Sequence, residues 1–513
     1  MRPRAPVTIL LHGRLRLTGP REGHSLVDRV RTTTCRLFIA AALAAAGVAG
    51  AAMGRPDPHS GPACLYAVTA GPGARDLSVE VTLRAGLGAE LAVDRGLGAF
   101  IRDPEVDDGG GWRALERQDD HLRAPPCRSR PCRIRYRFAL AEAARDVHDR
   151  NRAIEQEGAF LAPPSSWLVR PLEGGQSRFR LEVQAPPGTV FVTGLLPSRG
   201  GPASAYEATL DDLEEAPYSG FGPFETARID VPGGVVDVAI APGERDLPTR
   251  ALTAWAERAG RAVAGYYGRY PMPRVLVLIL PTGRRPIGFG TTLGNGGASI
   301  MIWVGRSATE ADLERDWVLT HEMVHTAFPN MPRQQRWLEE GIATYVEPIA
   351  RARAGTLSAE EVWRGLVEGL PKGLSRPGDP GLDRSRTWGS TYWGGALFCF
   401  MADLQIRERT GNRRSLDDAL RGINAAGGSI AVRWPLRRAL DAGDRATGTH
   451  VLRDLYGKMG EAPMPVDLDG WWRRLGIVAD GREIRFDERA PLAGLRRSIT
   501  ARPVSARAAG GGR

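Results

Sequence analysis

Two histidines four residues apart constrain this 513-residue chain more than any other feature of its sequence. They stand in the segment His-Glu-Met-Val-His, residues 321–325, and its flanks, free of glycine and proline, predict one continuous amphipathic helix over residues 310–328. On a helix, residues i and i+4 project from the same face. His321 and His325 can therefore reach a single tetrahedral Zn²⁺ and leave positions for a carboxylate and a water molecule.

Glu322, between the two histidines, is predicted to lie beside the water that the metal activates, where hydrolysis needs a general base. The remaining protein ligand is expected on a second helix. Residues 337–345, Trp-Leu-Glu-Glu-Gly-Ile-Ala-Thr-Tyr, have helical periodicity and offer two carboxylates. Local spacing does not separate Glu339 from Glu340, and either would complete a site of two histidines and one carboxylate for one zinc ion.

The composition is that of a globular protein with more than one domain. The chain is too long for one compact core, so two or three domains are expected. The net charge is +10, and nearly all positive residues are arginines scattered among acidic neighbours. Because the arginines form no basic stripe, the sequence predicts no nucleic-acid partner.

Residues 1–53 predict a signal peptide or an N-terminal anchor. Arg29, Arg31 and Arg36 precede an apolar run over residues 37–53, which contains a small-x-small cleavage pattern. The alternative is a buried alanine-rich helix. The protein is expected to be exported, to the periplasm, the cell surface or the extracellular space, and to meet a membrane only through this segment. Export permits a disulfide between Cys127 and Cys132.

Changes of pattern divide the rest of the chain. Residues 54–64 predict a linker, and residues 65–243 a β-rich domain, because short alternating strands are separated by glycine and proline turns. Residues 244–330 predict an α/β catalytic subdomain with strands at 274–280 and 298–304. Residues 331–480 predict a helical catalytic subdomain, and residues 481–513 a C-terminal tail.

Three motifs resemble one family. The segment around Glu340 resembles Trp-Leu-Asn-Glu-Gly-Phe-Ala of the gluzincin metallopeptidases of the aminopeptidase N group, and it is similar to Trp-x-x-Glu-Gly of the glycyl aminopeptidase group. The resemblance assigns the metal ligand to Glu340, directly before glycine. It implies that Glu347 holds a zinc-bound histidine. Tyr392, in Tyr-Trp-Gly-Gly-Ala, matches a Tyr-x-Lys-Gly-Ala segment whose tyrosine hydrogen-bonds the tetrahedral intermediate.

The resemblance also implies the fold class. It is a β-sandwich-like N-terminal domain followed by a mainly α, thermolysin-like zinc metallopeptidase domain with a small mixed sheet. One family motif is missing: aminopeptidase N relatives carry Gly-x-Met-Glu-Asn before the zinc helix, and its glutamate binds the free amine of the substrate. This chain has no acidic residue from 283 to 306. The backbone of Gly296, Gly297 and Ala298 is predicted to pair with an extended substrate instead.

The sequence thus predicts an exported zinc metallopeptidase, either an endopeptidase or an atypical aminopeptidase, that hydrolyses peptide bonds with a zinc-activated water. Its expected partner is a peptide or protein substrate. Two alternatives stay open: a zinc hydrolase of a non-peptide substrate, and a secreted binding or surface protein with a vestigial zinc site. The oligomeric state is not predicted.

Overall fold

The computed structural model describes residues 61–502, apart from residues 88–89, 126, 128–129, 203, 283–284, 377 and 482. The predicted signal peptide or anchor and most of the linker lie outside these described residues, as do residues 503–513. Within the described part of the chain, no helix is long and apolar enough to cross a membrane.

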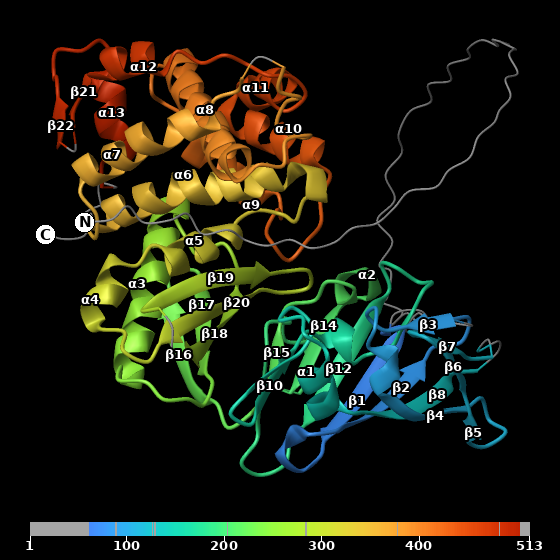
Figure 1. Cartoon of the computed structure of the whole chain (residues 1–513). Helices are drawn as coiled ribbons and strands as arrows, with labels where there is room; N and C mark the ends of the chain where they lie inside the picture. Colours follow the sequence, from blue (N-terminus) through green and yellow to red (C-terminus); the bar gives the residue numbers. More distant parts are fainter. Residues whose placement is uncertain are drawn as a thin grey trace, which may run out of the picture. The chain divides into compact units, whose positions relative to one another are not determined.

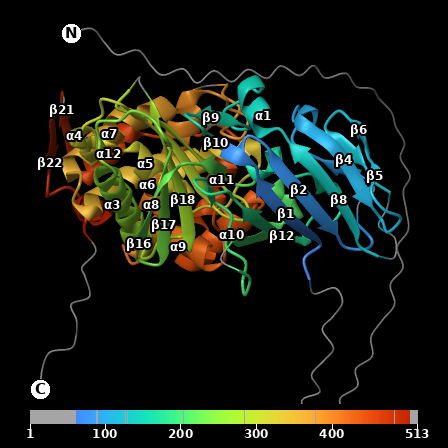
Figure 2. The ribbon, with the colours of Figure 1, turned by 90° about the horizontal axis from the view of Figure 1, so that it is seen from below.

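The N-terminal part is built from β-sheets, as predicted. Its largest sheet has the strand order β14 (Ala205–Thr209), β12 (Arg178–Gln184), β1 (Cys64–Ala70), β2 (Leu77–Leu83), β8 (Cys132–Phe138), β4 (Ile101–Asp107) and β5 (Arg113–Ala114) (Figure 2). Every second residue of β1, β2 and β8 is buried, because successive side chains of a strand point to opposite faces.

Two smaller sheets complete this part. One consists of β13 (Val190–Thr193), β15 (Ser219–Gly222), β10 (Ala159–Ala162) and β9 (Ile154–Gln156). The other consists of β11 (Arg170–Pro171), β3 (Glu90–Ala92), β7 (His121–Arg123) and β6 (Glu116–Gln118). Two short helices, α1 (Leu140–Asp146) and α2 (Leu210–Leu213), lie between strands. The predicted disulfide between Cys127 and Cys132 is present.

A mixed five-stranded sheet follows. Its order is β16 (Glu225–Val231), β17 (Gly234–Ile240), β18 (Arg274–Thr282), β20 (Ser299–Gly305) and β19 (Ile287–Leu293). The three central strands are parallel, and β16 and β19 are antiparallel to their neighbours. The predicted domain boundary at 243/244 therefore falls too late, because β16 and β17 pair with β18 and share its hydrophobic core.

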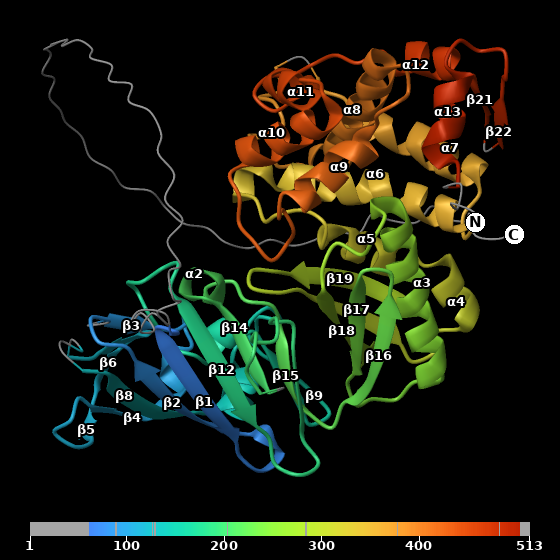
Figure 3. The same ribbon diagram turned by 180° about the vertical axis from the view of Figure 1, so that it is seen from behind.

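The two faces of this sheet have different neighbours. Helix α3 (Thr249–Tyr267) packs on β16 and β17, and α5 (Val318–His325) packs on β19 and β20 (Figure 3). On the opposite face, Leu276, Leu278 and Met301 share a core with Tyr218 and Phe224. The candidate zinc helix thus rests on the edge of the sheet that ends in β19.

The single helix predicted over residues 310–328 is wrong. The structure has α4 (Glu310–Arg315) and α5, separated at Asp316, whose backbone is extended. The Asp316 carboxylate accepts hydrogen bonds from the backbone N–H groups of Val318 and Leu319, each at 3.0 Å. Aspartate favours this capping position, and a residue that caps a helix start has a non-helical backbone. Trp317 consequently stands at the start of α5.

The C-terminal part is helical, as predicted, and is coloured yellow to red in Figure 1. Its elements are α6 (Arg336–Ala354), α7 (Ala359–Gly369), a π-helix (Gly389–Gly394), α8 (Gly395–Thr410), α9 (Leu416–Ala425), α10 (Leu436–Thr447), α11 (Val451–Met459) and α12 (Leu468–Leu475). Cys399 is buried in α8. A hairpin of β21 (Ile477–Asp480) and β22 (Glu483–Phe486) and helix α13 (Ala493–Thr500) follow. The predicted tail at 481–513 therefore begins too early, because Arg496 and Ile499 of α13 are buried.

A buried ion pair ties α6 to α9. Arg353 Nη1 lies 2.5 Å from Asp417 Oδ2, and the side chains are only 7% and 11% exposed. Arg353 also donates to the carbonyl of Ile499 in α13. Burial alone would raise the pKa of Asp417, but the Arg353 guanidinium outweighs burial and holds that pKa below its usual value. This pair anchors the C-terminal half of α6.

We predict that Asp417→Asn lowers the free energy of unfolding by about 3 kcal/mol, because the Arg353 charge stays buried without its partner. The pKa of Asp417 is lower in the folded state than in the unfolded state. The ionised carboxylate therefore contributes to the free energy of unfolding at pH values above its unfolded-state pKa, and this contribution is lost as the pH falls through its folded-state pKa. Urea unfolding at pH 7 and pH 3 measures both effects. Glu368→Gln, at an exposed position of α7, is the control. If the free energy of unfolding differed between variant and wild type by the same amount at both pH values, the prediction would be contradicted.

Candidate active site

Two packed helices bring the predicted metal ligands together. His321 and His325 lie one turn apart on α5, and Glu340 lies in the second turn of α6, which packs directly on α5 (Figure 1). His321 and Glu340 are each only 5% exposed. The donor atoms of all three residues lie within 4.8 Å of one another. The structure therefore assembles the two-histidine, one-glutamate set that the sequence predicts.

The distances fit a shared metal ion better than hydrogen bonds. Glu340 Oε2 lies 3.4 Å from His321 Nε2 and 3.5 Å from His325 Nε2. Both separations exceed the usual 2.7–3.2 Å of an N–H···O hydrogen bond. Two ligands of a tetrahedral zinc with bonds of about 2.0–2.1 Å are separated by about 3.3 Å. The Glu340 oxygen is therefore spaced from both imidazoles as two ligands of one such ion would be.

Glu339 occupies a different place from Glu340. Its Oε1 accepts a hydrogen bond of 2.8 Å from the backbone N–H of Met331, and Glu339 is not one of the three clustered ligand residues. Burial raises the pKa of Glu339 to about 7. The structure directs the side chain of Glu340, and not that of Glu339, toward the two histidines.

The ligands form a strongly coupled charge cluster. Burial alone would raise the pKa of Glu340, but His325 and His321 outweigh it and hold that pKa well below its usual range. Burial alone would lower the pKa of His325, yet the Glu340 carboxylate raises it to about 9. Because Glu322 also contributes negative charge here, a divalent cation would balance the cluster.

Glu322 is held against the edge strand β19. Thr292 Oγ1 donates to Glu322 Oε2 at 2.5 Å and to the main-chain carbonyl of Glu322 at 3.1 Å. A Cβ atom at Gly290 would lie 2.3 Å from Glu322 Cγ, so only glycine leaves room for this side chain. Our sequence reasoning missed both partners. The alternation of Gly290 and Thr292 on one face of a strand is the signal that could have found them.

Tyr392 lies at the same site, on the π-helix that precedes α8. Its ring stacks on the ring of His321, with 6.3 Å between centroids and 25° between planes. Burial and the negative charge of Glu340 raise the pKa of Tyr392, so its hydroxyl stays protonated at neutral pH. Helix α6 can approach the start of α8 closely because Gly341 has no side chain. A Cβ atom at this position would lie 2.2 Å from the backbone of Gly395. This glycine contact brings Tyr392 beside the ligands.

Arg336 is a further residue of the site that sequence reasoning missed. Its Nε lies 3.4 Å from Oε1 of Glu340, the oxygen that faces away from the histidines. The two residues are four apart in α6, and this i, i+4 spacing is the signal that could have found the pair.

Glu347 has a different partner from the one that the resemblance implies. Glu347 is buried, and its Oε1 accepts a hydrogen bond of 3.0 Å from Arg351 Nη1. Burial raises the pKa of Glu347 to about 7. Among the described residues, no hydrogen bond joins Glu347 to His321 or His325. Glu347 is therefore paired with an arginine of its own helix, four residues on.

The backbone of residues 296–298 is already engaged within the protein. The N–H groups of Gly296 and Ala298 donate to the carbonyls of Ala431 and Gly194, and their carbonyls accept from Leu196 and Leu276. These internal bonds occupy the backbone of Gly296 and Ala298, and the pairing of this segment with substrate stays a prediction. Strand β19, which carries the Glu322 contacts, is an edge strand that pairs with β20 alone among the described strands.

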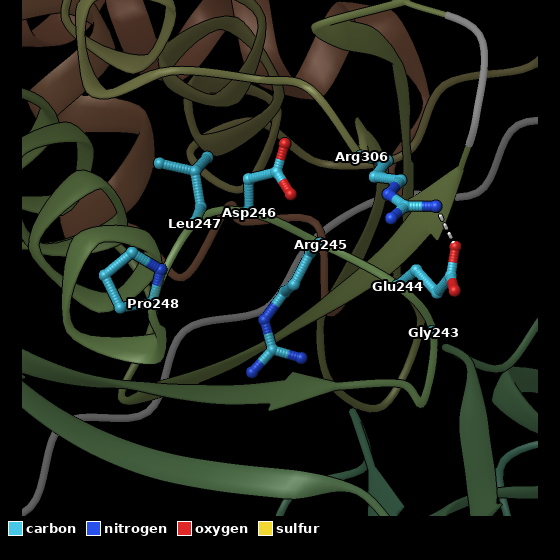
Figure 4. Close-up of a pocket in the computed structure, with 7 residues that line it drawn as sticks. All are labelled: Gly243, Glu244, Arg245, Asp246, Leu247, Pro248 and Arg306. Carbon is cyan, nitrogen blue, oxygen red and sulfur yellow. Dashed lines mark hydrogen bonds and ion pairs between the residues drawn. The ribbon is translucent and has the colours of Figure 1, made fainter.

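A separate pocket of about 470 Å³ lies between β17 and α3. Seven residues line it, and four of them are charged: Gly243, Glu244, Arg245, Asp246, Leu247, Pro248 and Arg306 (Figure 4). Arg306 pairs with Glu244, and Arg245 pairs with Glu225. None of the candidate metal ligands lines this pocket, so it is not part of the candidate active site.

No family model and no curated protein matches the chain, but solved structures do. A protein of the aminopeptidase N family from Idiomarina loihiensis has a TM-score of 0.62 and 14% identity, over 81% of this chain and 78% of its own. A variant of an M1 zinc metallopeptidase from Deinococcus radiodurans, solved with a Tyr-Ser-Ala substrate, has a TM-score of 0.50 and 16% identity, over 79% of this chain and 94% of its own. The chain has the fold of these metallopeptidases, as the motif resemblance predicts.

We predict that Glu340→Gln and His325→Ala each lower the affinity for Zn²⁺ more than about 100-fold, because loss of an outer-sphere partner alone costs about 10- to 100-fold. Zinc content after dialysis against a weak chelator measures this. Glu339→Gln is the matched control, since its amide oxygen can still accept the Met331 hydrogen bond. Retention of zinc by the Glu340 variant together with loss by the Glu339 variant would reverse the assignment.

Proposed function

We propose that this protein is a zinc-dependent peptidase, with one zinc ion held by His321, His325 and Glu340. The observation that carries the proposal is the convergence of these three donors beside Glu322, on a fold shared with zinc metallopeptidases. Bound zinc would polarise a carbonyl oxygen and lower the pKa of a water molecule from about 15.7 towards about 7.

Glu322 is the proposed general base. Its carboxylate would accept a proton from the attacking water and deliver it to the leaving amine, a role that needs a carboxylate within one hydrogen bond of both. Thr292 and Gly290 hold the side chain in place from β19. Restriction of Glu322 to one position lowers the entropic cost of reaching the reacting geometry.

Tyr392 is the proposed oxyanion donor. A neutral phenol can donate a hydrogen bond to the oxygen on which negative charge develops. Because burial and Glu340 raise its pKa, Tyr392 remains a donor over the whole neutral range. Its stacking on His321 keeps the ring next to the metal ligands.

A peptide is the proposed substrate. Its extended backbone would pair with β19, because main-chain hydrogen bonds to a sheet edge recognise any sequence. The Deinococcus radiodurans enzyme variant is solved with a Tyr-Ser-Ala substrate, and we infer peptide binding for this chain as well. Since residues 283–306 offer no acid to hold a free amine, we infer that cleavage does not depend on the substrate's N-terminus.

Export also belongs to the proposal. It rests on the basic and apolar pattern of residues 29–53 and is compatible with the Cys127–Cys132 disulfide. The role of the first 53 residues as a signal peptide or an anchor is part of the same proposal.

We predict that Glu322→Gln keeps its zinc and loses turnover by about 100- to 10,000-fold, because the amide cannot accept a proton. The measurement is digestion of a mixed peptide library by the zinc-loaded protein, with products identified by mass spectrometry. Internal cuts that disappear in the variant would support an endopeptidase, and stepwise loss of N-terminal residues would support an aminopeptidase. Undiminished turnover by the variant would refute the mechanism.

We predict that Tyr392→Phe lowers kcat about 100- to 1,000-fold with little change in KM, because the lost hydrogen bond forms only in the transition state. Steady-state kinetics on one peptide from the library measures the effect. Tyr456→Phe serves as the control, since its hydroxyl donates to Asp383 and not to a residue of the metal cluster. A rise in KM at constant kcat would assign Tyr392 to substrate binding instead.

A further inference from the structure

A second cavity lies in the helical part of the chain, away from the candidate active site. Its volume is about 840 Å³, and two turns between helices provide its walls, one that begins at the end of α8 and one between α10 and α11. Helix α8 starts directly after the π-helix that carries Tyr392, and its 16 residues span about 24 Å. The cavity is therefore a separate place in the fold.

The lining of this cavity is basic. Its polar side chains belong to three arginines, three threonines and one histidine: Arg409, Arg413, Arg414, Thr410, Thr447, Thr449 and His450. None of the described residues that line it is acidic, whereas the pocket between β17 and α3 has two acids beside its two arginines. We call this second cavity the basic cavity.

Two of its guanidinium groups are paired only loosely with carboxylates. Arg409 Nη1 lies 3.5 Å from Asp454 Oδ2, and Arg414 Nη1 lies 3.2 Å from Asp418 Oδ1. The arginine side chains remain 49% and 53% exposed. Exposed ion pairs of this kind contribute little to stability, so a ligand with more negative charge can compete for both guanidinium groups.

Arg413 is the arginine of the basic cavity with the most unused hydrogen-bond capacity. Its Nε donates to the main-chain carbonyl of Thr410 at 2.9 Å, which fixes the guanidinium at the end of α8. Among the described residues, Arg413 forms no ion pair, so both of its Nη groups stay available to a ligand. A guanidinium presents parallel N–H groups that match two oxygens of one phosphate group.

The opposite wall offers hydroxyl groups and open space. The hydroxyls of Thr447 and Thr449 lie 2.8 Å apart, on either side of Gly448. The backbone of Gly448 is left-handed, with φ at +69°, and a Cβ atom there would meet no heavy atom within 4 Å. Threonine hydroxyls and arginine side chains are both common contacts of phosphate oxygens.

We propose that the basic cavity binds a phosphorylated ligand through its phosphate groups, with Arg409, Arg413 and Arg414 as the main contacts. Three guanidinium groups offset more than one negative charge, and the volume falls within the range of small-molecule sites, about 300–1,000 Å³. A ligand larger than a single phosphate ion therefore fits best. A soluble phosphate compound and the phosphate headgroup of a lipid share this chemistry. The inference does not rest on the proposed peptidase function, because none of the candidate metal ligands lines the cavity.

The first test is calorimetric titration of the full chain with pyrophosphate, at about 0.15 M salt to screen nonspecific attraction. We expect one saturable site. Arg413→Ala and Arg409→Ala should each weaken the Kd about 10- to 100-fold, because each removes a charge-assisted contact. Arg437→Ala is the matched control, since Arg437 is an exposed arginine of α10 that does not line the cavity. An equal loss in the control variant, or no saturable binding by the wild type, would overturn the proposal.

A second variant separates the basic cavity from the metal site, because a bound zinc ion also accepts oxygen ligands. His325→Ala lacks one candidate metal ligand and keeps every residue of the basic cavity. Unchanged affinity of this variant for pyrophosphate supports the proposal, and loss of affinity overturns it. Neither outcome depends on whether the chain cleaves peptides.

Vesicles distinguish the two sources of the phosphate group. Co-sedimentation compares phosphatidylglycerol vesicles with phosphatidylcholine vesicles. If the full chain binds the phosphatidylglycerol vesicles, and both pyrophosphate and Arg413→Ala weaken this binding, the result supports a lipid headgroup as the ligand. Saturable binding of pyrophosphate without vesicle binding supports a soluble phosphate compound.

Discussion

A buried carboxylate shared between two buried imidazoles is the interaction on which the rest of this structure depends. Glu340 has one oxygen 3.4 and 3.5 Å from the two histidines, and little of it reaches solvent. Buried charges are costly unless they are paired or coordinate a metal. The packing of α5 on α6 brings these buried charges together. A metal ion bound between them would offset the cost of their burial, and the geometry of the cluster fits metal binding.

The surroundings of the cluster serve to hold it in one arrangement. The sheet supports α5 from one side, and β19 holds Glu322 through Thr292 and the space beside Gly290. Helix α6 is held from its far end by the pair of Arg353 with Asp417. Its approach to the start of α8, directly after the π-helix, is possible because Gly341 and Gly395 have no side chains. Preorganised positions of this kind are what hydrolysis at a metal site requires.

The substrate side of the site differs from the family pattern that the motifs resemble. No acid stands on β19 or in its flanks, and the backbone groups of Gly296 and Ala298 form internal hydrogen bonds. What the structure offers instead is β19, an edge strand that pairs with β20 alone among the described strands. Main-chain hydrogen bonds to a strand edge do not depend on the sequence of the bound segment.

The sequence by itself determined which residues are candidate metal ligands and most of the local structure. The spacing of His321 and His325 decides that both face one way on any helix, and the alternation in strands such as β1 and β8 decides which side is buried. Tertiary structure decided what depends on contacts between distant segments. Strands β16 and β17 join the mixed five-stranded sheet because β18 pairs with β17, and these strands are far apart in the sequence. Glu340 rather than Glu339 meets the histidines because the packing of α6 on α5 sets which face of α6 they meet.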